Sequence, residues 1–199
     1  MGVVIPTSWR LAFLLPTVVA VGALEAGSAR AETDLARDTT HDMVQITRQH
    51  PAQSAPDPEA AFGDLTALRV RYGTSRVHAV LHVRRLDHSR RFGTTFEVKY
   101  GGPAGFHYAQ VSIGVRRDHW QGHLTWAGDD LRPCDVAHAI DYRHDRISMS
   151  FPASCIDAPP WVKSRILFVS RARVGVFDID DLPEQPRTVG SYGVRVHRG

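Results

Sequence analysis

The sequence predicts an all-β protein: a single, jelly-roll-like β-sandwich with one disulfide-closed hairpin. Two observations lead to this fold class. From about residue 65 onward, apolar and polar residues alternate in short runs separated by turn residues, and no stretch keeps a helical period beyond two turns. The only two cysteines, Cys134 and Cys155, lie at equal distances on either side of the dipeptide His144-Asp145, as expected for the two arms of a hairpin.

The N-terminus has the features of a secretory signal peptide. Arg10 precedes an apolar run from Leu11 to Leu24, and the small-residue site Ala29-Arg30-Ala31 follows. The run is shorter than the roughly 20 residues that a membrane-spanning helix needs. We therefore expect cleavage after Ala31 and a secreted, extracellular product that keeps no membrane segment. An uncleaved anchor is the alternative.

The segment from 32 to 58 is polar and rich in proline, and it shows no apolar period, so it is interpreted as a flexible leader. The predicted organisation is a signal peptide over 1–31, this leader over 32–58, the β-sandwich domain over 59–183 and a C-terminal tail over 184–199 that can add a last strand. The chain is long enough for one domain with a real core.

About eight short strands are expected in the sandwich. The first two form a hairpin over 65–84 around the turn Gly73-Thr74-Ser75, and the others cover 96–100, 108–115, 120–126, the two arms of the cysteine hairpin, 161–171 and 174–179. Residues that share one face of a strand are expected in the core; they are Val77, Ala79, Leu81, Val83, Phe96, Val98, Tyr100, Ala109, Val111, Ile113, Val115, Trp120, Leu124 and Trp126. Trp161 is assigned to the core as well.

A two-residue turn at His144-Asp145 places the two sulfurs opposite each other at a non-hydrogen-bonded pair, where a disulfide can form. The same register pairs Tyr142 with Ile147 and Ile140 with Met149. Pro152 lacks the N–H that the ladder needs, so the strand is expected to break there and the residues up to Cys155 can form a short helical turn. Two free, buried thiols are the alternative to the disulfide.

The charge balance bears on the partners. The formal net charge is +3, and it falls to +2 when the segment with Arg10, Arg30 and Glu25 is removed. Nucleic acid is not expected as a partner, because its binding usually requires a basic stripe. No Asn occurs in the chain, so N-glycosylation is excluded, and the sequence does not specify the oligomeric state.

A resemblance covers roughly residues 57 to 182. The run Gly63-Asp64, the hairpin that follows it and an aromatic β-meander lead to Pro133-Cys134 and Ser154-Cys155. This pattern resembles a group of uncharacterised secreted actinobacterial proteins. More distantly, the strand pattern is similar to sandwich modules of the carbohydrate-binding type and to DOMON domains, which bind haem or sugar. The similarity implies a fold and assigns no residue a role.

Polar residues are expected on the outward face of the early strands. His78, His82, Glu97, Tyr108, Gln110 and His123 are the candidate ligand-binding residues. A mixture of one aromatic ring with amides and charges is typical of sugar-binding surfaces, and an ordinary solvated sheet face is the alternative. His78 and His82 are roughly 13 Å apart along an extended strand and cannot share an ion, whereas a cross-strand pair such as His82 with His123 can.

Acidic residues gather in three predicted turns. Asp178, Asp180 and Asp181 lie close together in sequence, Asp64 opens the first strand, and Asp129-Asp130 forms another pair. Hard cations take oxygen ligands from turns of this kind, so the first four are candidates for a calcium site. No EF-hand spacing is present, and turn-forming aspartate is the alternative. No other cofactor is expected.

The sequence favours a secreted, non-catalytic β-sandwich module that binds a carbohydrate or cell-wall glycan. It contains no nucleophile elbow, no H-E-x-x-H zinc motif and no phosphate loop, and both cysteines are assigned to the disulfide, so no enzyme activity is expected. A structural or protein-interaction domain without a small ligand is the first alternative. A hydrolase, marked by a His within hydrogen-bond reach of both a Ser and an Asp, is the second.

Overall fold

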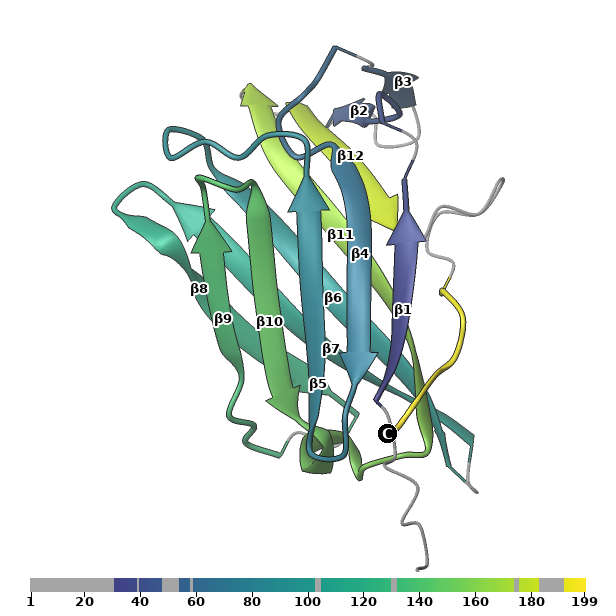
Figure 1. Cartoon of the computed structure of the whole chain (residues 1–199). Coiled ribbons are helices and arrows are strands. Elements are labelled where there is room, and N and C mark those ends of the chain that lie inside the picture. The colour runs from purple at the N-terminus through teal and green to yellow at the C-terminus, as the bar shows by residue number, and fades with distance from the viewer. Residues whose placement is uncertain are drawn as a thin grey trace, which may run out of the picture.

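The computed structural model describes residues 31–38, 40–47, 54–57, 59–102, 105–129, 132–173, 176–182 and 192–199. These residues form two antiparallel β-sheets packed face to face, with one short 3-10 helix and no α-helix among them (Figure 1). The predicted all-β sandwich is confirmed. Residues 1–30, which hold most of the predicted signal peptide, lie outside the described part. Within that part, no helix has the length and apolar character to cross a membrane.

The two sheets differ in size. The five-stranded sheet has, in spatial order, the strands β1 (Glu32–Arg37), β4 (Leu65–Tyr72), β5 (Arg76–Val83), β10 (Arg146–Pro152) and β9 (Ala137–Asp141). The eight-stranded sheet has β3 (Ser54–Pro56), β2 (Val44–Thr47), β12 (Val176–Leu182), β11 (Trp161–Arg173), β6 (Phe92–Gly102), β7 (Gly105–Arg116) and β8 (His119–Gly128), and β13 (Val196–His197) pairs with β11. The chain changes sheet five times, after β1, β3, β5, β8 and β10.

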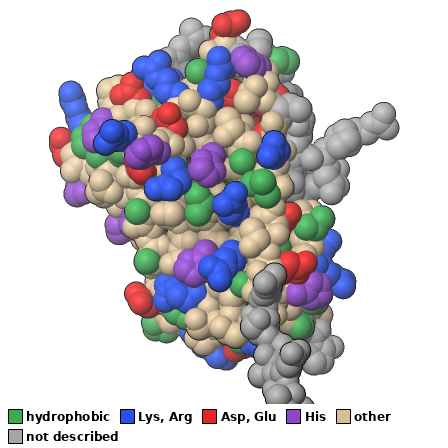
Figure 2. Space-filling model, viewed as in Figure 1, with side chains coloured by type: hydrophobic (Ala, Val, Ile, Leu, Met, Phe, Trp, Pro, Cys, Tyr) green, Lys and Arg blue, Asp and Glu red, His purple; other side chains and the backbone are tan. Residues whose placement is uncertain are grey.

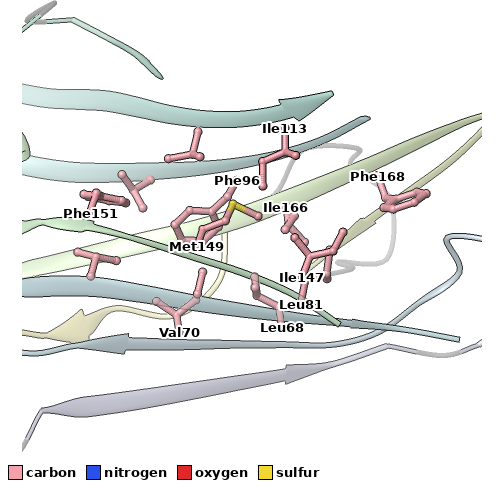
Figure 3. Close-up of a cluster of buried hydrophobic side chains, with 14 of the residues drawn as sticks. Leu68, Val70, Leu81, Phe96, Ile113, Ile147, Met149, Phe151, Ile166 and Phe168 are labelled. Atoms are coloured by element: carbon pink, nitrogen blue, oxygen red, sulfur yellow. The ribbon is translucent and has the colours of Figure 1, made fainter. Parts of the chain in front are cut away.

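The core lies between the two sheets. It is built from the inward side chains of strands that alternate buried and less buried positions, as in β5, where Val77, Ala79, Leu81 and Val83 are buried. Figure 3 shows side chains from both sheets meeting in this layer, among them Leu81, Ile147, Phe96 and Ile166. Trp120, Leu124 and Trp126 are partly buried and pack against it. The predicted inward faces of β5 to β8 are confirmed.

The expectation of a flexible leader over 32–58 is wrong for the described residues of that segment. Glu32–Arg37 pairs with β4 as the edge of the five-stranded sheet, and Val44–Thr47 pairs with both β12 and β3. The edge strand β1 has no buried side chain, so its sequence can stay polar and gives only a weak strand pattern. The predicted last strand in the C-terminal tail is present as β13.

The hairpin of β9 and β10 has a longer turn than predicted. Ile147 pairs with Ile140 and Arg146 with Asp141, so four residues, and not two, connect the strands. Asp141 stabilises this turn because its carboxylate accepts hydrogen bonds from the backbone N–H groups of Arg143 and His144, each at 3.2 Å. The pairs predicted for Tyr142 and for Met149 are therefore wrong by two positions, a shift that keeps every side chain on its predicted face.

The disulfide between Cys134 and Cys155 is present. It does not join two ladder positions, because Cys134 precedes β9 and Cys155 lies in the 3-10 helix Ala153–Ile156. The predicted helical turn after Pro152 is thus confirmed. The bond ties the segment that enters the edge strand β9 to the helix that follows β10.

The open side of the sandwich, where the edge strands β8 and β9 face each other, is bridged by side chains. The Tyr142 hydroxyl donates a hydrogen bond to the Trp120 carbonyl at 2.5 Å, and His138 Nε2 lies 2.8 Å from the Gln121 carbonyl. On the other side the C-terminal residues bridge the sheets. β13 pairs with β11, while the His197 N–H donates to the Glu32 carboxylate and the Gly199 N–H donates to the Tyr72 carbonyl.

Candidate ligand-binding surfaces

The six residues predicted to form one polar surface lie on two different sheets. His78 and His82 belong to β5 in the five-stranded sheet, because the chain crosses to the other sheet after Val83. Glu97, Tyr108, Gln110 and His123 belong to β6, β7 and β8 in the eight-stranded sheet. The outer faces of the two sheets point away from each other, so no single small ligand contacts all six. For the same reason His82 and His123 cannot share a metal ion.

Three of the six residues come together on the outer face of the eight-stranded sheet. Glu97 pairs with Gln110 across β6 and β7. Tyr108 is two residues before Gln110 on β7, so its side chain lies on the same face. With Asp129 they line a shallow hollow of about 250 Å³. The Asp129 carboxylate accepts a hydrogen bond from the Tyr108 backbone N–H at 2.8 Å, which holds the end of β8 against β7.

Aromatic rings gather beside this hollow. We call Phe106, Tyr108, Trp161 and Tyr192 the aromatic cluster. The Phe106 and Trp161 ring centroids are 6.3 Å apart, and those of Tyr108 and Tyr192 are 6.1 Å apart. Phe106 is 58% exposed and Tyr108 is 39% exposed, so Phe106 has the larger exposed fraction of the two. The cluster is thus an aromatic patch open to solvent.

Two cations hold the cluster in place. Lys99 Nζ lies 4.2 Å from the Phe106 ring centroid, 5.6 Å from that of Tyr108 and 5.7 Å from that of Tyr192. Arg165 lies over the Tyr192 ring at 4.9 Å and pairs with the Glu97 carboxylate at 2.9 Å. Each such contact between a cation and a ring contributes about 0.5–1 kcal/mol at exposed sites.

Sequence reasoning found Tyr108 and missed most of its neighbours. Trp161 was assigned to the core, yet it lies on the outer face opposite Gly101, where a Cβ atom would come within 2.7 Å of its ring. Glycine at that position lets the indole lie against β6. Tyr192 was missed because it lies in the tail, more than eighty positions after Tyr108 in the sequence, and no local pattern connects the two.

The outer face of the five-stranded sheet carries His78 and His82 among arginines. Burial lowers the pKa of His78, and the nearby Arg76 and Arg71 lower it further. Burial likewise lowers the pKa of His82. Beside His78 the face is hollowed by about 220 Å³ over a floor of small residues that belong to β9 and β10. A neutral imidazole is expected at both positions near pH 7.

A third concave region lies at one end of the sandwich, where the β5–β6 and β9–β10 connections approach β8. Its volume is about 640 Å³, and Leu86, His88, Ile140 and Tyr142 are among the residues that line it. The His88 ring meets the Tyr142 ring edge to face with a centroid separation of 3.8 Å. Burial raises the pKa of Tyr142 to about 12. Sequence reasoning missed this region because two connections and the strand β8, all distant in sequence, build it.

Of the four aspartates predicted to bind calcium, the structure describes the side chains of Asp64 and Asp180. Asp180 is buried, and its carboxylate accepts a hydrogen bond from the Leu65 N–H at 2.6 Å. One carboxylate oxygen from each of Asp38, Asp42 and Asp180 lies within 4.8 Å of the other two. The sequence did not predict this group, because Asp38 and Asp42 were interpreted as part of a flexible leader.

Asp64 is engaged nearby and is fully buried. Its carboxylate accepts a hydrogen bond from the His41 N–H at 3.2 Å and pairs with Arg84 at 3.4 Å. Asp178 and Asp181 belong to β12, and their side chains lie outside the described part. Calcium binding by the predicted set stays a prediction.

The comparisons with known proteins add no family. No protein-family model matches the chain, and no curated protein matches it.

Proposed function

We propose that the protein is an exported, non-catalytic module that binds a carbohydrate on the outer face of the eight-stranded sheet. The observation that carries this proposal is the exposed aromatic cluster beside a shallow polar hollow. A sugar ring has an apolar face that stacks on an aromatic side chain and hydroxyls at its rim that need hydrogen-bond partners. Phe106 and Tyr108 offer the rings, and Glu97, Gln110 and Asp129 offer the partners.

The compartment supports the same proposal. A disulfide persists in oxidising surroundings such as the extracellular space, so the bond between Cys134 and Cys155 is compatible with export. The predicted signal peptide leads to the same compartment. Glycans are abundant polymers outside the cell, and a shallow open surface suits a chain that extends beyond its contact site.

The test is a binding measurement on the oxidised protein with a panel of soluble glycans, followed by titration calorimetry on any that bind. We expect Tyr108→Ala to weaken binding of a recognised glycan at least tenfold, which corresponds to about 1.4 kcal/mol. Leu35→Ala is the matched control, because Leu35 is a similarly exposed apolar residue at 41% on the opposite sheet. Equal affinities of the two variants, or no binding across the panel, would contradict the proposal.

A structural domain without a small ligand is the second candidate, and one observation favours it. Lys99 and Arg165 already lie against the rings of the cluster, as expected if the rings serve to hold Tyr192 and the C-terminal segment in place. In that case Tyr192→Ala lowers the melting temperature and no glycan raises it. If the cluster binds sugar, a recognised glycan raises the melting temperature of the wild type through linkage.

A hydrolase would place a His within hydrogen-bond reach of both a Ser and an Asp. In the described ranges, the histidine nitrogens within hydrogen-bond distance of a partner contact Thr40, the Gln121 carbonyl and Asp141. No His in these contacts lies between a Ser and an Asp. The absence of catalysis remains part of the proposal. It is tested by recovering the glycans after binding, and we expect them to be unchanged.

A further inference from the structure

The outer face of the five-stranded sheet is basic, as Figure 2 shows with arginine and histidine side chains spread over the sheet that faces the viewer in Figure 1. The register places its outward side chains in three rows that cross all five strands. From β1 to β9 the rows are Thr33, Arg71, His78, Ser150 and Ala137; Leu35, Arg69, Val80, Ser148 and Ala139; and Arg37, Ala67, His82, Arg146 and Asp141. Four of these positions are arginine, and one is a carboxylate.

That single carboxylate is already engaged. Asp141 accepts hydrogen bonds from Arg146 at 3.2 Å and lies 2.8 Å from His144 Nδ1. In contrast, among the described residues no carboxylate lies within ion-pair distance of Arg37, Arg69 or Arg71, all of which are exposed. Positive charge on this face is therefore not neutralised locally, although the whole chain is nearly balanced at +3.

The hollow of about 220 Å³ lies directly beside these charges. Its floor is low because β9 and β10 present the small residues Ala137, Ala139, Ser148 and Ser150 outward at this place. Arg76 stands at its edge, where its guanidinium donates to the carbonyl and to the hydroxyl of Ser150, each at 3.2 Å. An anionic group that enters the hollow meets the Ser150 hydroxyl below and the Arg76 guanidinium at the side.

We propose that this face binds a linear anionic polysaccharide, a glycan with carboxylate or sulfate groups along its length. The inference goes beyond the function proposed above, because it concerns the opposite sheet and a different chemical class of glycan. Guanidinium groups match the geometry of carboxylate and sulfate oxygens and bind them through paired hydrogen bonds. Outward positions repeat roughly every 6.6 Å along a strand and every 4.8 Å across strands, a spacing that suits a polymer with regularly repeated charges.

Other polyanions fit the face less well. Proteins that bind single-stranded nucleic acid use exposed aromatic platforms for the bases, and none of the exposed large aromatic residues in the described ranges is on this sheet. A membrane surface is bound by burying apolar side chains among the headgroups. Leu35 is the one exposed large apolar residue that the described strands place on this face.

The test compares two double variants that remove the same charge. Arg69→Ala with Arg71→Ala removes the arginines at the centre of the face, and Arg116→Ala with Arg117→Ala removes exposed arginines at the β7–β8 turn of the other sheet. Binding of polygalacturonate and heparin is measured by calorimetry at several salt concentrations. We expect the first variant to lose at least tenfold in affinity with a weaker salt dependence, and the second to stay within about twofold of the wild type.

Three results would overturn the inference. One is no binding of either polysaccharide by the wild type at low salt. Another is an equal loss in both double variants, which would show attraction to net charge alone. The third is tighter binding of the wild type to anionic lipid vesicles or to single-stranded DNA than to either polysaccharide. Tyr108→Ala is included to separate the two proposals, since it is expected to leave polyanion binding unchanged even if neutral-glycan binding fails.

Discussion

At the scale of single residues, the fold depends on positions where one atom more would not fit. Gly63 has a φ of +85°, and a Cβ atom there would lie 2.0 Å from Cε1 of Phe168. Phe168 is fully buried and stacks with Phe92 at a centroid separation of 5.0 Å. The glycine therefore serves both the left-handed backbone and the ring packing at the start of β4.

We expect Gly63→Ala to lower the free energy of unfolding by about 3 kcal/mol, because left-handed strain and overpacking add together. Gly114→Ala is the control, since the outward Cβ at that position would meet no atom within 4 Å. Urea unfolding of both variants measures the difference. A similar midpoint for the two would show that Phe168 gives way without cost.

Tyr72 links ionisation to stability. It is fully buried, its hydroxyl donates to the Pro159 carbonyl at 2.7 Å, and burial raises its pKa to about 12, against a smaller lowering by Arg198. The unfolded chain ionises this group near pH 10, whereas the folded protein keeps the proton to about pH 12. Stability is therefore expected to fall as the pH rises from 10 to 12.

Tyr72→Phe should reduce that loss and should cost about 1–3 kcal/mol at neutral pH, because the Pro159 carbonyl is left without its donor. Chemical denaturation at pH 8, 10 and 11 measures both effects. Tyr142, whose pKa burial also raises to about 12, keeps part of the alkaline dependence in this variant. An unchanged pH dependence in Tyr72→Phe would contradict the assignment.

At the scale of elements, the disulfide secures an edge. Cys134 and Cys155 are 21 positions apart, and their bond closes a loop that contains the whole β9–β10 hairpin. In the chain-entropy model, closing such a loop stabilises the folded state by about 3 kcal/mol. A double Cys→Ser variant should lose about that much in urea unfolding. Reductant should destabilise the wild type to a similar level and leave the variant unchanged; a wild type indifferent to reductant would contradict this.

The histidines of β5 are expected to make the binding of anionic polysaccharide depend on pH. Arg71 and Arg76 lie around His78, whose other neighbour across the sheet is Ser150. Since its pKa is lowered, it gains a charge only below its usual range near pH 6.5. Anionic polysaccharide is therefore expected to bind more tightly as the pH falls from 7 to 5.

His82 acts in the same direction, with Arg146 and Arg69 as its charged neighbours and Asp141 beyond Arg146. Replacing both histidines by Gln should flatten the pH dependence of the affinity and preserve the affinity at pH 7.5. Calorimetry at three pH values measures this. A wild-type affinity that does not change between pH 7 and pH 5 would contradict the prediction.

Strand patterns predicted some elements and not their partners. Alternation identified β5 to β8 because their buried faces repeat every second residue, a local property of the chain. Membership of a sheet is not local, so His78 and Tyr108 were placed together although the chain changes sheet between them. The turn length of the β9–β10 hairpin depends on hydrogen bonds to the Asp141 carboxylate, which alternation does not reveal.

At the scale of the whole molecule, the two sheets present different chemistries in opposite directions. The outer face of the eight-stranded sheet carries rings and a polar hollow, and that of the five-stranded sheet carries exposed arginines such as Arg69 and Arg71, which have no ion-pair partner among the described residues. If both proposals hold, one protein binds two glycan chains at once. We expect a mixture of the two polymers with the protein to become turbid, and Tyr108→Ala to abolish the turbidity.

The side-chain bridges across the open side of the sandwich have a consequence for resistance to proteolysis. An edge strand is the segment that a protease can most readily draw into its active site, because its free backbone groups can pair with the enzyme as an added strand. On β8, the carbonyls of Trp120 and Gln121 are already occupied by the side chains of Tyr142 and His138. Two residues of the neighbouring hairpin thus make these two carbonyls unavailable to an added strand.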